Sequence, residues 1–319
     1  MKKSIKLMAL GLAVVPCALM LTACGGGADN DIVDVKGDYE PIQESEYSAV
    51  IEQLDEGFSL DQIAKGLKAV ITVDASADFE NGKFDLSYRA ESTMKGNPDD
   101  GYLDLNDLEA YSKVSANADI EMAGQKAELK ASAKQYVVDG TQYIDISGAK
   151  DILQMVDPET QMPTKFYVGM DLEDIEPIQI PEYNISTLLE MIPEGEWGEM
   201  LTLSKTETEN GFTIKIVATD DVLNETFDAL KSEMEFDVDV NFTKDFEVYV
   251  VYANNAFSGL YIDSELQVTV NLDTQDNPYA QMIGSSLTVD VALNAQIATY
   301  AGDIDFPSFK GYSNLPVEM

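Results

Sequence analysis

Residues 113–122 read Lys-Val-Ser-Ala-Asn-Ala-Asp-Ile-Glu-Met, with apolar side chains at every even position and polar ones at every odd position. Successive side chains of a β-strand point to opposite faces of the sheet, so this pattern predicts a strand with one buried and one solvated face. Sheets of this kind are typically antiparallel, because parallel sheets are usually covered on both faces. This stretch therefore sets the fold class.

The same alternation recurs along much of the chain. It is found in residues 69–79, 84–90, 127–133, 212–218, 236–242, 246–252, 260–272 and 287–297. Asn81-Gly82 and Asp139-Gly140 fall between such runs, and these dipeptides favour the tight turn of a β-hairpin. The pattern predicts about ten or eleven long strands that pair as antiparallel neighbours.

Helical spacing is confined to a few short segments. Residues 45–56 carry an apolar stripe, and Ser59-Leu60-Asp61-Gln62 matches a capping box. Residues 147–200 are interrupted by five prolines, so only short helices are expected there, over 148–156 and 187–192. A further helix is expected over 222–234. These helices must cover the apolar side of the sheet. We therefore expect an α+β fold: a large curved antiparallel sheet, half-barrel-like, with helices on its concave face. The alternative is two sheet domains divided near residue 195.

The N-terminus has the layout of a secretory signal peptide. Three lysines precede the apolar residues 7–21, and the segment ends Leu21-Thr22-Ala23-Cys24. A helix over 7–21 would span about 22 Å, short of the roughly 30 Å hydrocarbon core that a membrane-spanning anchor must cross. The ending resembles the lipobox of bacterial lipoproteins. The resemblance implies that a diacylglyceryl group is attached to the Cys24 thiol and that the chain is cut before this residue.

The leader divides the chain into three expected parts. Residues 1–23 form the signal peptide, and residues 24–44, which begin with three glycines and continue acidic, form a flexible tether. Residues 45–319 form the folded domain. We expect the protein outside the cytoplasm, lipid-anchored to the outer face of the cell membrane or, in a cell with two membranes, to the outer membrane.

The charge of the chain limits its partners. Removing the three leader lysines leaves 20 − 3 = 17 basic and 58 acidic residues, a net charge of 17 − 58 = −41. Nucleic acids and anionic headgroups both require a basic face, so the folded part should be repelled by an anionic membrane and held only by its lipid. The acidic excess is either a solvated surface or a site for a cationic partner such as calcium, a polyamine or a basic polymer.

Several kinds of catalytic chemistry are excluded. The chain has no histidine, and its two cysteines are Cys17, which leaves with the leader, and Cys24. Thiol nucleophiles, imidazole bases and the usual zinc sites are therefore absent. We expect a non-enzymatic protein without cofactor or metal, and a monomer that binds no nucleic acid.

The mature chain resembles the lipoprotein-carrier group, which includes the Lol-type periplasmic carriers and related actinobacterial and firmicute lipoproteins. The features that carry the resemblance are the lipobox, the helix pair before the first strand, and the strand meander interrupted by helices over about 45–319. The resemblance is architectural. It implies a curved sheet of this kind, and no catalytic or ligand motif can be transferred with it.

A methionine-rich middle segment suggests where a hydrophobic ligand could bind. Methionine repacks around varied shapes, and alanines on a facing sheet would leave room for a ligand. The predicted ligand site combines Met155, Met162, Phe166, Met170, Met191 and Trp197 with Ala116, Ala118 and Ala131. The alternative is close packing of helices on the sheet. The functional expectation is thus a tethered protein that binds a lipid or other hydrophobic ligand, or else a structural or protein-interaction module of the cell envelope with a fully packed sheet and an acidic surface.

Overall fold

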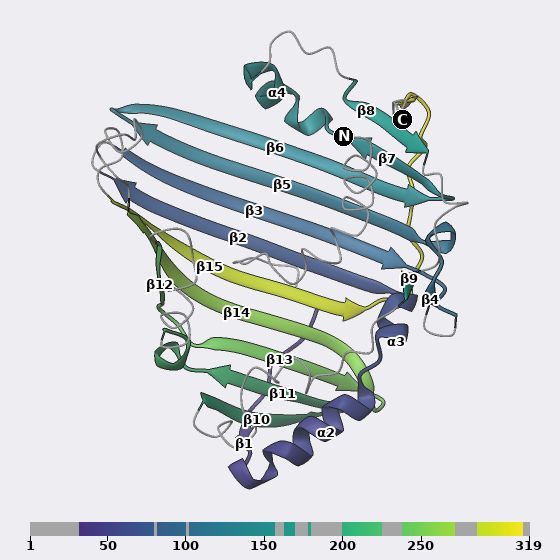
Figure 1. Ribbon diagram of the computed structural model, residues 1–319, viewed down its shortest axis with the longest axis vertical. Coiled ribbons are helices and arrows are strands. Elements are labelled where there is room, and N and C mark those ends of the chain that lie inside the picture. Colours follow the sequence, from purple (N-terminus) through teal and green to yellow (C-terminus); the bar gives the residue numbers. More distant parts are fainter. Residues whose placement is uncertain are drawn as a thin grey trace.

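One large β-sheet dominates the fold (Figure 1). The computed structural model describes residues 32–79, 82–99, 102–156, 163–169, 178–179, 200–224, 238–271 and 286–314. In spatial order the strands are β1 (Glu40–Pro41), β10 (Leu201–Thr208), β11 (Gly211–Ala218), β13 (Phe246–Ala253), β14 (Ala256–Asn271), β15 (Ser286–Thr299), β2 (Leu67–Phe79), β3 (Gly82–Lys95), β5 (Glu109–Met122), β6 (Gln125–Val138), β7 (Thr141–Asp145), β8 (Lys165–Gly169) and β16 (Ser313–Asn314).

The sheet is open and mixed. All neighbours along this order are antiparallel except β8 and β16, which pair in parallel. A further strand, β12 (Val238–Phe242), pairs with β14, while β4 (Tyr102–Leu103) and β9 (Ile178–Gln179) form a separate small sheet. Strands from both sides of residue 195 therefore share one sheet: β10 to β15 continue directly into β2.

The helices are short. They are η1 (Glu44–Glu46), α2 (Tyr47–Gly57), α3 (Leu60–Lys65), η2 (Leu105–Asp107), η3 (Ser147–Ala149) and α4 (Lys150–Val156). Helices are thus present where the sequence predicts them around residues 45–67 and 148–156. Residues 220–224 are helical, at the start of the helix expected over 222–234. The remainder of that helix and the one expected over 187–192 lie outside the described residues.

The strand register places the apolar positions of neighbouring strands opposite one another. A single row across the sheet, from β10 to β6, reads Leu203, Ile216, Val248, Ile262, Ala295, Ile71, Ala90, Val114 and Ala133. Because side chains alternate with period two, the neighbouring positions on each strand point the other way. We call the side that carries this row the apolar face and the opposite side the polar face.

Tight turns of one type close several hairpins. Asp139 and Gly140 both have positive φ, 49° and 64°, as the sequence predicts for this dipeptide. The same conformation occurs at Ala123-Gly124 and at Asn254-Asn255. Two successive positive φ values are the signature of a type I′ turn, whose twist matches that of the flanking strands.

The main hydrophobic core lies between α2 and the apolar face of one end of the sheet. Tyr47, Ile51 and Leu54 form the buried stripe of α2, and Leu54 is fully buried. Their partners come from β10, β11, β13 and the start of β14: Leu201, Leu203, Phe212, Ile214, Ile216, Val250, Tyr252 and Phe257. Fully burying each large apolar side chain contributes about 1.5–3 kcal/mol, so this contact fixes the helix on the sheet.

Helices do not all lie on the apolar side. The backbone of Gly148 in η3 approaches Ser132, a polar-face residue of β6, so closely that a Cβ atom at 148 would overlap the serine Oγ. The side chain of Asp145 holds this segment by accepting hydrogen bonds from the Ser147 amide and hydroxyl. The expectation that helices pack on the apolar side therefore applies to α2, whereas η3 contacts the polar face.

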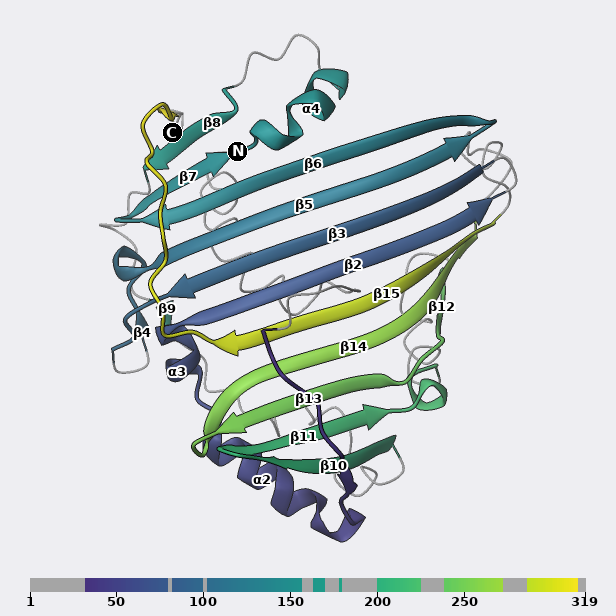
Figure 2. The same cartoon turned by 180° about the vertical axis from the view of Figure 1, so that it is seen from behind.

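Both terminal segments run over the polar face (Figure 2). At the N-terminal end, Val33 is buried against Gly259, and Tyr39 makes an edge contact with Tyr249 at 5.6 Å between ring centroids. At the C-terminal end, Phe309 stacks on Tyr143 with centroids 3.7 Å apart. Residues 32–44, which the sequence assigns to the tether, thus make specific contacts with the sheet.

Candidate functional site

Four of the predicted ligand-binding residues lie on the apolar face. Ala116 on β5 is directly opposite Ala131 on β6, and Ala118 follows two residues along β5. Phe166 on β8 is buried, and its register with Ile144 places it on the same face. The structure therefore brings the two predicted alanine strands together as neighbours.

The methionine-rich part of the predicted site is largely outside the described residues. Met162, Met170, Met191 and Trp197 all fall there. Met155 belongs to α4, but its side chain is not among those described. The arrangement of these side chains around the alanines therefore stays a prediction.

The apolar face is fully buried at one end of the sheet and partly exposed farther along. Beneath α2 its side chains are excluded from water, as at Ile214 and Val250, which are 0% and 1% exposed. Farther along, on β3, β5 and β6, the apolar side chains are only partly buried: Leu86, Ala90, Val114, Ala116, Ala118, Leu129, Ala131 and Ala133. Among the described strands from β11 to β8, no charged residue occupies this face. The apolar surface thus extends well beyond the core.

Three adjoining hollows lie on the opposite, polar face. The first has a volume of about 450 Å³ and is lined by Arg89, Ser115, Ser132 and other residues of β2 to β6, with Gly148 of η3; Ala116 and Ala131 also belong to its lining. It shares Asp74 and Ser87 with a second hollow, which shares Asp85 with a third. The sequence pattern predicts a binding cavity on the apolar side and does not predict these hollows on the polar face. Most of their lining residues occupy the polar positions of the alternation, and the rest are flanking apolar positions such as Ala116, but only the strand register shows that they are neighbours.

The polar face carries much of the positive charge of the chain. Its basic strand residues are Lys68, Lys83, Arg89, Lys95, Lys113, Lys126, Lys130, Lys134, Lys165 and Lys215. Its acidic strand residues are Asp74, Asp78, Asp85, Glu91, Glu109, Asp119, Glu121, Glu128, Asp145, Asp239, Glu247, Asp263, Glu265 and Asp290. The described strands of this face therefore sum to 10 − 14 = −4.

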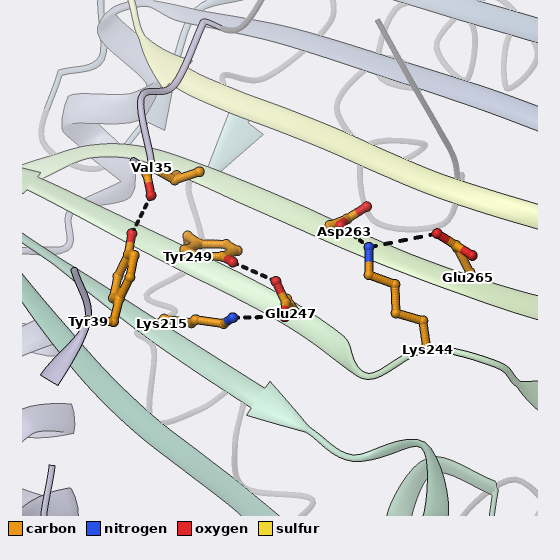
Figure 3. A network of polar contacts seen from close by, with 8 residues as sticks. All are labelled: Val35, Tyr39, Lys215, Lys244, Glu247, Tyr249, Asp263 and Glu265. Atoms are coloured by element: carbon orange, nitrogen blue, oxygen red, sulfur yellow. Dashed lines mark hydrogen bonds and ion pairs between the residues drawn. The ribbon is translucent and has the colours of Figure 1, made fainter. Parts of the chain in front are cut away.

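A network of polar contacts joins β11, β13 and β14 on this face (Figure 3). Glu247 accepts hydrogen bonds from Lys215 at 2.8 Å and from the Tyr249 hydroxyl at 2.5 Å. Burial raises the pKa of Glu247, but the contacts with Lys215 and Tyr249 outweigh burial and hold it below its usual value. Burial and the hydrogen bond to Glu247 both raise the pKa of Tyr249. The network thus keeps the carboxylate charged and the phenol neutral.

The N-terminal segment adjoins the same network. The Tyr39 hydroxyl donates a hydrogen bond to the Val35 carbonyl at 2.7 Å, and burial followed by the neighbouring Tyr249 raises the pKa of Tyr39 to about 12. Nearby, Lys244 contacts Asp263 at 2.5 Å and Glu265 at 3.8 Å. The hydrogen bond with Asp263 is the main cause that raises the pKa of Lys244. These contacts pair charges that would otherwise be left on a half-buried surface.

Metal ligation and membrane spanning find no support in the described part of the chain. No three acidic, histidine or cysteine side chains within it gather closely enough to hold a metal ion. In the acidic loop before β5, Asp104 instead accepts hydrogen bonds from the Asn106 amide and side chain. Nor is any described helix long and apolar enough to cross a bilayer.

Comparison with known proteins assigns no family. No protein-family model matches the chain, and no curated protein gives a significant match. Among solved structures, the chain is similar to LprF from Mycobacterium bovis, with 11% sequence identity and a TM-score of 0.26, over 83% of this chain and 98% of LprF. Similarity at this level is too low to transfer a fold or a function.

Proposed function

We propose that this protein is a non-enzymatic envelope lipoprotein, tethered through Cys24, that holds a lipid or other hydrophobic molecule against the apolar face of its sheet. The supporting observation is the partly exposed, uncharged apolar surface on β3, β5 and β6. Such a surface gains free energy when another apolar group removes it from water, at about 25 cal/mol per Å².

The size of the side chains on this surface also favours a ligand. Ala116 and Ala131 face each other across β5 and β6, with Ala118 and Ala133 beside them. Alanine fills little of the space that leucine or phenylalanine would occupy, so an acyl chain or a ring can approach the strands closely. The core beneath α2, by contrast, is filled by large side chains such as Phe212 and Tyr252.

The proposal is tested with a chain that begins at residue 25, which has neither the apolar leader nor the acylated Cys24, so that any lipid found is bound by the folded domain. Native mass spectrometry should detect a co-purifying hydrophobic molecule, and an apolar fluorescent probe should bind. Ala116→Phe should weaken probe binding at least tenfold with little loss of stability. Ser87→Phe, an exposed polar-face control on β3, should leave probe binding unchanged.

A packed sheet would give the opposite result. Ala116→Phe would then overfill a close-packed interior, which costs about 1–3 kcal/mol, and neither lipid nor probe would bind. That outcome would reject the ligand-binding proposal and favour the structural or interaction module.

A further inference from the structure

We propose that the polar face is the side of the domain that faces the headgroups of the anchoring membrane. The proposal rests on the lipid anchor at Cys24 in the proposed function, but not on the hydrophobic ligand. The observation that carries it is the place where the N-terminal segment joins the sheet, together with the short tether that remains.

The N-terminal segment joins the sheet on its polar face. The Ile32 amide donates a hydrogen bond to Gln296 Oε1 at 2.8 Å, and the Val33 amide donates to the same oxygen at 3.4 Å. Val33 is 5% exposed and packs over Gly259, where a larger residue would crowd it. Gln296 and Gly259 belong to β15 and β14, near the middle of the strand order (Figure 2). The tether is thus fixed to one face rather than to an edge.

The remaining tether is short. Seven residues, 25–31, lie between Cys24 and Ile32, which makes eight Cα–Cα steps. Fully extended, they reach at most about 28 Å, and a glycine-rich chain of this length has a typical end-to-end distance of about 16 Å. With the polar face towards the membrane, a tether of this length is long enough for the lipid on Cys24 to reach the bilayer.

The opposite orientation would require an almost fully extended tether. From Gln296 the chain would run about 10 Å to the end of β15, and then past a sheet and a helix layer about 20 Å thick. This route of about 30 Å is as long as the tether at full extension and about twice its typical end-to-end distance. The position of α2 on the apolar side therefore favours the polar face as the membrane side.

The charge of this face adds no preference. The described strand residues of the polar face sum to 10 − 14 = −4, whereas the apolar face of the described strands from β11 to β8 carries no charged residue. Lys113 and Lys134 lie directly opposite each other, and each also lies opposite a carboxylate residue, Glu91 on β3 and Asp145 on β7. The preference for this side therefore comes from the tether alone.

This orientation turns the apolar face away from the anchoring membrane. A hydrophobic ligand would then be exchanged on the distal side of the domain rather than with the lipids directly beneath it.

The experiment uses the full acylated chain in vesicles of phosphatidylcholine with a minor share of phosphatidylglycerol. The mature chain has no cysteine besides the acylated Cys24, so a single introduced cysteine can carry a donor fluorophore. Ser87→Cys places it at an exposed position of the polar face, and Gln53→Cys places it on the exposed side of α2. Energy transfer to a headgroup-linked acceptor should be greater from position 87. Inserting a Gly-Ser segment after Gly27 should reduce the difference.

Equal transfer from the two positions, or greater transfer from position 53, would overturn the orientation. Flotation of the vesicles separates this result from a failure of the anchor. A chain that does not float with the vesicles is not lipid-anchored, and the proposed tether and the orientation would then both be rejected.

Discussion

The hydroxyl of Tyr252 on β13 donates a hydrogen bond to the backbone carbonyl of Leu54, in the last turn of α2. The last four carbonyls of a helix have no partner within the helix, so this side chain satisfies one of them. Burial, with a smaller effect of Asp55, raises the pKa of Tyr252. The phenol therefore stays neutral and able to donate. One contact thus ties the end of the helix to the sheet.

Tyr252→Phe removes only this hydroxyl. Because the Leu54 carbonyl is then buried without a partner, the free energy of unfolding should fall by about 1–2 kcal/mol. Tyr252→Ala also leaves a cavity and should cost about 3–5 kcal/mol. Urea denaturation measures both variants. Wild-type stability in Tyr252→Phe would mean that the hydrogen bond contributes nothing to the helix–sheet contact.

Ser264 is the polar exception on the apolar face of β14. It is fully buried opposite Leu293, and its Oγ has no hydrogen-bond partner in the described structure. A buried hydroxyl without a partner loses its hydrogen bonds to water and gains none in the protein. Ser264→Ala should therefore raise the free energy of unfolding by about 1 kcal/mol. Ser87→Ala on the exposed polar face is the matched control and should change little. Destabilisation by Ser264→Ala would show that the hydroxyl has a partner after all.

Much of the fold follows from local pattern. The alternation in residues 113–122 and its repeats place the strands, and the turn at Asp139-Gly140 joins two of them as predicted. The turn at Ala123-Gly124 was not predicted, because alanine seldom adopts the positive φ that it has here.

The candidate site depends on information that one strand does not contain. Alternation assigns Ala116 and Arg89 to opposite faces, but it does not show that Ala116 lies beside Ala131 or that Arg89 lies beside Ser115. Register is a property of pairs of strands. The same holds for the terminal segments: nothing periodic in residues 32–39 indicates that they lie on the polar face.

The contact between Lys215 and Glu247 should make stability depend on pH. The pKa of Glu247 is lowered in the folded state, so its contribution is present above its ordinary pKa near 4.3 and is lost as the pH falls through the folded value. Glu247→Gln should lower stability by about 1 kcal/mol at neutral pH and approach the wild type in acid. Denaturation at a series of pH values tests this. A stability difference that does not change with pH would contradict it, and the more exposed Glu265→Gln should have little effect at any pH.

Cys24 carries the proposed anchor. Cys24→Ala removes the thiol that would be acylated, so the variant should remain uncleaved before residue 24 and lack the diacylglyceryl mass. Cys17→Ala lies in the leader and should be processed as the wild type is. Intact-mass measurement after expression in a bacterial host compares the two. Cleavage before residue 24 and a diacylglyceryl mass in Cys24→Ala, as in the wild type, would show that the lipobox interpretation is wrong.

The two faces of the sheet should respond differently to charge. Val250 is 1% exposed beneath α2, and an unpaired carboxylate buried there would cost several kcal/mol, against a total stability of about 5–15 kcal/mol. Val250→Asp should therefore unfold the domain or nearly so. Val291 lies on the same face but is partly exposed, so Val291→Asp should cost less.

The neighbouring Asp290 provides the matched control on the polar face. Its side chain is exposed and accepts a hydrogen bond from Gln267 at 2.8 Å. Asp290→Val should change stability by only about 0.5 kcal/mol. Thermal melts of the three variants should therefore rank Val250→Asp as the most damaging and Asp290→Val as the least. If Asp290→Val and Val291→Asp were equally damaging, both faces of β15 would be buried. The partly exposed apolar surface proposed to hold a ligand would then have to be abandoned.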